Sequence, residues 1–280
     1  MELFFALAAR ILSNSLANVF QKKLAGGGVC AGRVIFGSYA LVALAALPML
    51  PWRENLGLGF WALCLASGAL GAAGNYFLVR ALEIGDLSVL GPINSYKAVV
   101  GMLFGAALLG EVPDFSGLSG VLLIICGSFL LVGKTAKFSA ALFGDKSVRF
   151  RFYALVFAAC EAVFLKKIIL ESSVGAAFAA WAVFGAAFSL PLARGGGFSR
   201  ASFSARSALL FAGIAISIGT MQYATNAVFA NMQVGYALAL FQLSGVLSVF
   251  FGALFFGEKN IMRKFAGSLI MCSGAALIFV

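Results

Sequence analysis

The stretch VFQKK at residues 19–23 returns as VFLKK at residues 163–167, an offset of 144 residues. Leu47-Pro48 returns in the same way as Leu190-Pro191, at an offset of 143. A third set returns 147 residues later: Gly105, Gly110-Glu111, Gly120 and Gly127 recur as Gly252, Gly257-Glu258, Gly267 and Gly274. Self-similarity at a nearly constant spacing indicates two copies of one structural unit. The chain is therefore predicted to be an internal duplication.

The amino-acid composition indicates whether this chain folds in water or in a lipid bilayer. Hydrophobic residues make up 62% of the sequence and charged residues 11%, with a net charge of +10. Soluble domains carry about a quarter charged residues. The basic residues fall mostly in short gaps between apolar runs, as loop charges of membrane proteins do, so we expect no nucleic-acid binding. The sequence predicts a multi-pass protein of the lipid bilayer, placed in the cell (inner or plasma) membrane.

Apolar runs define the predicted helices, since a membrane-spanning helix needs about 20 mainly apolar residues. We expect ten of them, at residues 3–21, 31–50, 57–79, 86–109, 116–133, 151–170, 174–193, 207–229, 233–256 and 263–280. Residues 1–133 form the first five-helix repeat, 134–150 a basic linker, and 151–280 the second five-helix repeat. Because five is odd, the second repeat must enter the membrane from the opposite side. The predicted fold is an all-α integral membrane protein with ten transmembrane helices in two inverted five-helix repeats.

Inverted repeats are typical of secondary transporters, in which two similar bundles exchange conformations and expose a site to each side in turn. An enzyme would need a catalytic constellation, but the chain has no histidine, no phosphate-binding loop and five cysteines without Cys-x-x-Cys spacing. We therefore predict no catalytic residues, no metal site and no cofactor. A channel would be expected to show rings of charge or a filter sequence, and neither is visible.

Several motifs also resemble the EamA-type permeases of the drug/metabolite transporter superfamily. They are Gly91-Pro92, the run closing in Leu-Leu-Gly-Glu at 108–111 and the glycines Gly120 and Gly127, with Phe-Phe-Gly-Glu at 255–258, Gly267 and Gly274 as the second copy. The resemblance implies a ten-helix secondary carrier of small metabolites, often an exporter of amino acids or similar compounds, with a central cavity. Leu238-Ala239 stands opposite Gly91-Pro92, so a helix break is expected in the first repeat only.

Lys97 and Glu161 are the most informative charges. Lys97 lies near the middle of an apolar run, where a lysine costs about 2.5–3.5 kcal/mol. Neither charge is duplicated, because the matching positions are Ser244 and Ala17. One interpretation is a structural ion pair, or a lysine that extends to the interface. The other, which we favour, is that Lys97 faces the cavity and binds a carboxylate or changes protonation, with Glu161 as its partner.

Other polar and aromatic residues recur on predicted helix faces, where lipid offers their amides no partner. The candidate substrate-binding residues are Lys97, Glu161, Asn14, Asn18, Asn75, Tyr76, Asn94, Gln222, Tyr223, Asn226, Gln242, Tyr39 and Trp181. The alternative for many of them is hydrogen bonding between helices, and for Tyr39 and Trp181 simple packing. Glu111 and Glu258 are interpreted structurally, as acids beside the N-terminus of the following helix.

This set of residues suits a small solute with a carboxylate and a partly apolar body. We therefore expect an amino-acid-like substrate, with a proton as a candidate coupling ion. Polyspecific efflux of lipophilic or cationic drugs is the alternative. The orientation stays open: the loop charges place the linker in the cytoplasm and both termini outside, whereas the family resemblance implies that both termini are inside.

Overall fold

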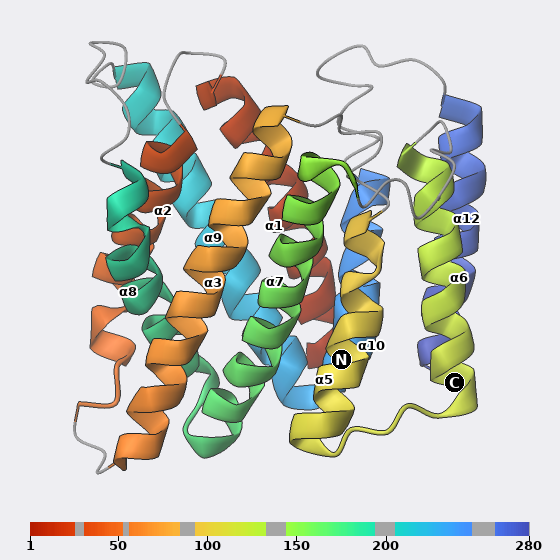
Figure 1. Ribbon diagram of the computed structural model, residues 1–280, viewed down its shortest axis with the longest axis horizontal. Coiled ribbons are helices and arrows are strands. Elements are labelled where there is room, and N and C mark those ends of the chain that lie inside the picture. Colours follow the sequence, from red (N-terminus) through yellow and green to blue (C-terminus); the bar gives the residue numbers. More distant parts are fainter. Residues whose placement is uncertain are drawn as a thin grey trace. The chain divides into compact units, whose positions relative to one another are not determined.

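The computed structural model describes residues 1–25, 31–52, 56–84, 93–132, 144–193, 205–247 and 261–279. Helices fill these ranges and no strand occurs in them (Figure 1). The elements are α1 (Glu2–Ala25), α2 (Ala31–Ala46), η1 (Leu47–Met49), α3 (Leu58–Ile84), α5 (Lys97–Leu109), α6 (Phe115–Val132), α7 (Lys146–Glu171), α8 (Val174–Ala193), α9 (Ala205–Asn231), α10 (Val234–Leu240), η4 (Phe241–Leu243) and α12 (Ile261–Ile278). The expectation of an all-α fold is confirmed for the described residues.

Among the described residues, four helical segments are long and apolar enough to cross a membrane: Gly32–Met49, Leu58–Leu78, Val174–Ala193 and Ser207–Asn231. Shorter apolar helices cover Ile93–Leu109, Phe115–Leu130, Val234–Leu247 and Ala266–Ile278. Because a helix needs about 20 apolar residues to span the hydrocarbon core, the first group supports integral membrane insertion. The full count of ten spanning helices stays a prediction.

The first compact unit comprises residues 1–72 and 164–231, so it draws on both halves of the sequence. In it α1 packs against α9, and α2 packs against α8. One core cluster consists of Leu24, Val34 and Ile214, all buried. Helix α2 closely approaches α8 at Gly32, where an added Cβ would collide with the Leu192 carbonyl. The η1 turn that follows α2 makes an ordinary contact with the other end of α8, because a Cβ added to Gly175 would lie 3.9 Å from the Met49 Cβ.

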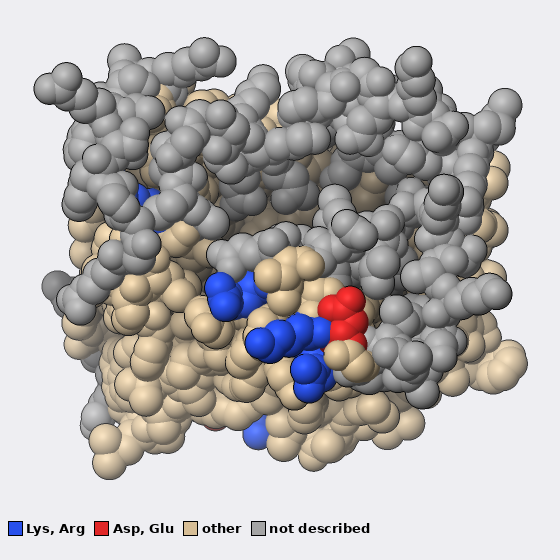
Figure 2. All heavy atoms as spheres, turned by 45° about the horizontal axis from the view of Figure 1, so that its top comes forward, with Lys and Arg blue, Asp and Glu red and all other residues tan. Residues whose placement is uncertain are grey.

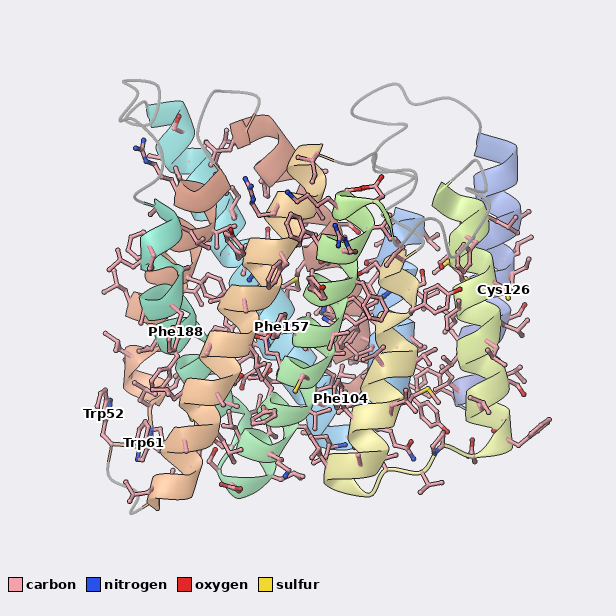
Figure 3. All side chains as sticks on the ribbon, viewed as in Figure 1. Trp52, Trp61, Phe104, Cys126, Phe157 and Phe188 are labelled. Carbon is pink, nitrogen blue, oxygen red and sulfur yellow. The ribbon has the colours of Figure 1, made fainter. Side chains whose placement is uncertain are left out.

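The second compact unit comprises residues 73–163 and 232–280. In it α6 packs against α12, and α5 against α10. The end of α3 meets the start of α7 through Phe77, whose ring stacks on Phe157 (labelled in Figure 3) at a centroid distance of 5.6 Å.

Helices α6 and α12 approach each other at small residues on both sides. A Cβ added to Gly120 would lie 2.5 Å from the Gly274 carbonyl oxygen, and a Cβ added to Gly127 would lie 2.6 Å from the Gly267 carbonyl oxygen. Both distances are too short for a side chain, so the backbones are in direct contact at these points. Close approach of this kind stabilises helix pairs in lipid.

Helix α7 begins earlier than expected. The linker was predicted to extend through residue 150, but the helix starts at Lys146. The Asp145 carboxylate explains the start, because it accepts hydrogen bonds from the Ser147 backbone N–H at 2.7 Å and from the Ser147 hydroxyl at 2.8 Å. Lys146 and Arg149 are exposed in the first turn, and Figure 2 shows Lys and Arg side chains gathered beside acidic groups on one face.

The connection between α5 and α6 corrects the prediction for Glu111. Its carboxylate accepts the backbone N–H of Val234 at 2.8 Å, so Glu111 caps α10 and not the next helix in sequence. Asp114 caps α6 instead, because it accepts the Gly117 N–H at 2.7 Å. That bond, followed by the bond from the Tyr236 hydroxyl, lowers the pKa of Asp114 below its usual value. Glu258 lies outside the described residues.

Candidate functional site

Two interrupted helices define the polar centre of the second unit. Residues 93–95 are helical, Tyr96 forms a turn, and α5 then begins at Lys97. In the helix predicted to match it in the second half of the chain, α10 ends at Leu240 and a 3-10 turn covers Phe241–Leu243. The expectation of an irregularity in the first repeat alone was therefore wrong.

The second interruption forms without a proline. The Ser244 hydroxyl donates to the Phe241 carbonyl at 2.8 Å, and such a bond competes with the regular helical pattern. Short 3-10 stretches inside helices often mark functional hinges. Gly91-Pro92, on which the predicted break depended, lies outside the described residues.

Asn94 and Gln242 join the two interrupted helices. The Asn94 amide nitrogen donates to the Gln242 side-chain oxygen at 3.4 Å. Beside them the Ser95 and Ser128 hydroxyls are hydrogen-bonded to each other, and Ser128 also donates to the Ile125 carbonyl at 2.7 Å. Two residues that the sequence singled out, 148 positions apart, are thus brought into contact.

Lys97 and Glu161 belong to the same unit, and both are half-buried. Lys97 is the first residue of α5. A helix N-terminus carries partial positive charge, so a cation there is unfavourable for the helix. Helix formation alone therefore does not explain a lysine at this position. Asn75 is half-buried in α3, and Tyr76 is 44% exposed with its ring edge-on to Phe77 at 5.4 Å.

In the first unit, aromatic rings connect three predicted residues. Tyr39 of α2 lies 4.6 Å from Trp181 of α8, measured between ring centroids. Phe178 stacks on Trp181 at 6.4 Å and meets the edge of Tyr223 of α9 at 5.6 Å. Sequence reasoning missed Phe178, although its spacing of three residues from Trp181 places both rings on one helix face.

The polar pair of this unit lies on α9. The Gln222 amide nitrogen donates to the Asn226 side-chain oxygen at 2.9 Å, and both residues are buried. Asn14 is half-buried in α1, the helix that packs against α9. Asn18 also belongs to α1, but its side chain lies outside the described residues.

The predicted residues thus fall into two groups, one in each unit. The first unit holds Asn14, Asn18, Tyr39, Trp181, Gln222, Tyr223 and Asn226; the second holds Asn75, Tyr76, Asn94, Lys97, Glu161 and Gln242. Within the described residues no three acidic, cysteine or histidine side chains gather in a way that could hold a metal ion. The arrangement offers amides, aromatic rings and the charged side chains of Lys97 and Glu161 as groups that can bind a solute.

Comparison with known proteins identifies the kind of molecule. Residues 2–133 match the profile of the EamA-like transporter family. Residues 2–133 therefore belong to the EamA-like transporter family. The family resemblance seen in the sequence is thereby confirmed, and the protein is a membrane transporter of small molecules within the drug/metabolite transporter superfamily.

The fold of this EamA-like transporter is similar to that of a solved structure described only as a protein crystal structure. The two chains are 15% identical, the similarity covers 98% of this chain and 95% of the other, and the TM-score is 0.81. No curated protein matches the sequence. At this level of identity the structural similarity supports the fold alone.

Proposed function

We propose that this EamA-like protein is a secondary transporter that moves amino-acid-like metabolites across the cell membrane by alternating access. The observation that carries the proposal is the Asn94–Gln242 hydrogen bond, which joins two interrupted, repeat-related helices next to Lys97. Carriers commonly build their binding sites at interrupted helices, where backbone and side-chain polar groups become available to a solute.

Reciprocal contacts support the inverted repeat that alternating access requires. Gly120 approaches Gly274 and Gly127 approaches Gly267, and an offset of 147 residues exchanges the two contacts. Gly120 contacts the counterpart of Gly127, and Gly127 contacts the counterpart of Gly120. Reciprocal contacts of this kind are made by two elements that are related by a two-fold axis. The contacts advance from Gly120 to Gly127 along α6 while they go back from Gly274 to Gly267 along α12, so the two helices run antiparallel.

A second helix pair repeats this pattern independently. Gly32 meets Leu192 and Met49 meets Gly175, and these contacts are exchanged by an offset of 143 residues. The same offset relates the two Leu-Pro dipeptides in the sequence. Two helix pairs with reciprocal contacts favour five-helix repeats of opposite orientation, and with them the ten-helix count.

The charges define the proposed substrate class. Lys97 binds the carboxylate of the solute, and Glu161 is its partner in the remainder of the cycle, with a proton as the coupling ion. A lysine at the first position of a helix is unfavourable for that helix, because its charge has the same sign as the helix N-terminus. A bound carboxylate would compensate both positive charges, which is why we assign Lys97 to substrate binding.

Uptake into proteoliposomes tests the proposal. Purified protein is reconstituted, and the entry of a panel of labelled amino acids is compared with that of a cationic dye. We expect amino-acid uptake, and we expect Lys97→Met to remain folded in detergent but lose it. If Lys97→Met transports normally, or if it unfolds and the Lys97→Met/Glu161→Gln double variant regains stability and transport, the two charges are structural.

Polyspecific efflux of lipophilic cations is a second candidate, favoured by the four connected rings Tyr39, Trp181, Phe178 and Tyr223. Aromatic faces attract cations that have lost their hydration shell. Transport of the dye without any amino acid would select this function over the first.

A further inference from the structure

The Gln222–Asn226 pair holds one amide in a defined orientation inside α9. Asn226 is 0% exposed, and its side-chain oxygen accepts a hydrogen bond from the Gln222 amide nitrogen at 2.9 Å. The acceptor side of the Asn226 amide is therefore occupied. Its nitrogen is also buried, and it has no hydrogen-bond partner among the residues that the structure describes.

The residues next to Asn226 in α9 are apolar or already hydrogen-bonded. Val228 and Phe229, two and three positions further along the helix, are buried and apolar. The neighbouring Thr225 hydroxyl donates to the Met221 carbonyl of its own helix at 2.8 Å. A buried donor without a partner destabilises the fold, and such groups in native proteins often have a functional role.

Position 226 also departs from the repeat. Gln222 matches Asn75 at the offset of 147 residues, so an amide occurs at this point in both halves. Asn226 matches Val79, which carries no polar group. A packing interaction demanded by the duplicated scaffold would be expected in both halves, whereas a contact to an asymmetric solute is needed only once.

We propose that Asn226 is a specificity-determining residue whose two amide N–H groups bind an acceptor oxygen of the transported solute, and that Gln222 is the positioning residue that orients it. This inference rests on the proposed function and assigns part of the solute recognition to α9. A carboxylate accepts hydrogen bonds through both of its oxygens. An ammonium or guanidinium group has no acceptor, so the pair selects carboxylates over simple cations.

The test compares two probes that differ in a single group. L-Phenylalanine carries a carboxylate, and phenethylamine is the same molecule without it. Uptake of both into proteoliposomes is measured for the wild type, for Asn226→Leu, which keeps the volume but removes the donors, and for Asn231→Leu, a matched control near the end of the same helix. Asn231 is exposed, and its amide nitrogen donates to the Ala227 carbonyl of the same helix at 2.8 Å.

We expect Asn226→Leu to lower L-phenylalanine uptake at least tenfold while phenethylamine uptake stays within twofold of wild type and Asn231→Leu changes neither. Gln222→Glu gives a sharper readout, because its carboxylate accepts from the Asn226 nitrogen and turns the amide oxygen towards the solute. We expect that variant to raise the KM for L-phenylalanine and lower the KM for phenethylamine. Unchanged L-phenylalanine uptake in Asn226→Leu would overturn the inference.

A stability measurement decides the inference even if neither probe is transported. The double variant Gln222→Leu/Asn226→Leu removes the Asn226 donors together with the Gln222–Asn226 hydrogen bond and leaves no new unpaired amide, so its melting temperature in detergent without solute should equal or exceed that of the wild type. A lower melting temperature would show that these donors stabilise the fold, and would overturn the proposed role. Failure of the wild type to move any amino acid would instead count against the proposed function.

Discussion

Replacement of Gly120 by alanine tests the contact between α6 and α12. The new Cβ would lie 2.5 Å from the Gly274 carbonyl oxygen, 2.8 Å from the Ile278 Cγ1 and 3.2 Å from the Ile278 backbone nitrogen. Two of these three atoms belong to the backbone, so a change of side-chain rotamer cannot relieve the clash. The helices must separate or shift along each other to accommodate the methyl group.

Two opposing effects determine the size of the change. Alanine is more favourable than glycine within a helix by about 0.5–1 kcal/mol. Overpacking of a close contact costs about 1–3 kcal/mol, and a clash with backbone falls in the upper part of that range. The net destabilisation is therefore about 2 kcal/mol. A change of this size lowers the melting temperature by about 4–8 °C.

Thermal unfolding of the purified protein in detergent, followed by tryptophan fluorescence, measures the effect. Gly59→Ala is the matched control, because nothing lies within 4 Å of its added Cβ and it also replaces a helical glycine. We expect Gly59→Ala to melt at or slightly above the wild-type temperature. Gly274→Ala should resemble Gly120→Ala, and the double variant should lose less than the sum, because both changes act on one contact.

The melting temperature of Gly120→Ala relative to Gly59→Ala decides whether the close contact between α6 and α12 exists. If Gly120→Ala melts as high as Gly59→Ala, helix propensity has outweighed the contact, and α6 and α12 do not approach as closely as the geometry requires. Full additivity in the double variant would indicate two separate contacts.

Three further predictions concern topology and the α5–α6 connection. Reporter fusions after Phe138 and Gly195 should report the same side of the membrane and a fusion after Ser172 the opposite side; any other pattern excludes ten spans. Glu111→Ala should lower stability by about 0.5–2 kcal/mol, measured by thermal unfolding, because the first N–H of α10 loses its acceptor, while Glu111→Gln, which keeps an acceptor oxygen, should lose less. For Asp114 the folded pKa lies below the usual 3.8, so its stabilisation is present above that value and lost as the pH falls through the folded pKa. The melting temperatures of wild type and Asp114→Asn should therefore differ at neutral pH and converge in acid, and a constant difference would refute this role of the carboxylate.

The sequence anticipated the location of helices better than the roles of single residues. Apolar runs and their periodicity are local properties, so predicted ranges such as 174–193 coincide with the observed helix. The start of α7 was placed too late, because Lys146 and Arg149 were interpreted as part of a polar linker. The hydrogen bonds of Asp145 depend on the three-dimensional position of a side chain and allow the helix to begin in a charged segment.

Candidate residues were predicted as polar stripes, and the structure decides which of them meet. Asn94 and Gln242 are in contact, although they are distant in sequence and lie on different predicted helices. Gln222 and Asn226 are also in contact, as residues four positions apart on a helix can be, but they were predicted only as substrate-binding candidates. Phe178 was missed because a phenylalanine in an apolar helix carries no signal until its neighbours on other helices are known.

By itself, the sequence determined that the chain is helical, inserts into a membrane and resembles a known family of carriers, and it predicts an internal duplication. These properties follow from composition and from spacings along the chain, and neither requires knowledge of which helices are neighbours. Only the tertiary structure decided that Glu111 caps α10 and that the helices around Tyr96 and Phe241 are both interrupted. It also decided that the Asn226 oxygen accepts a hydrogen bond while its nitrogen has no partner among the described residues. The physical reason is that capping, close glycine contacts and hydrogen-bond satisfaction depend on pairs of groups brought together by helix packing, and many different packings are compatible with the same pattern of apolar runs.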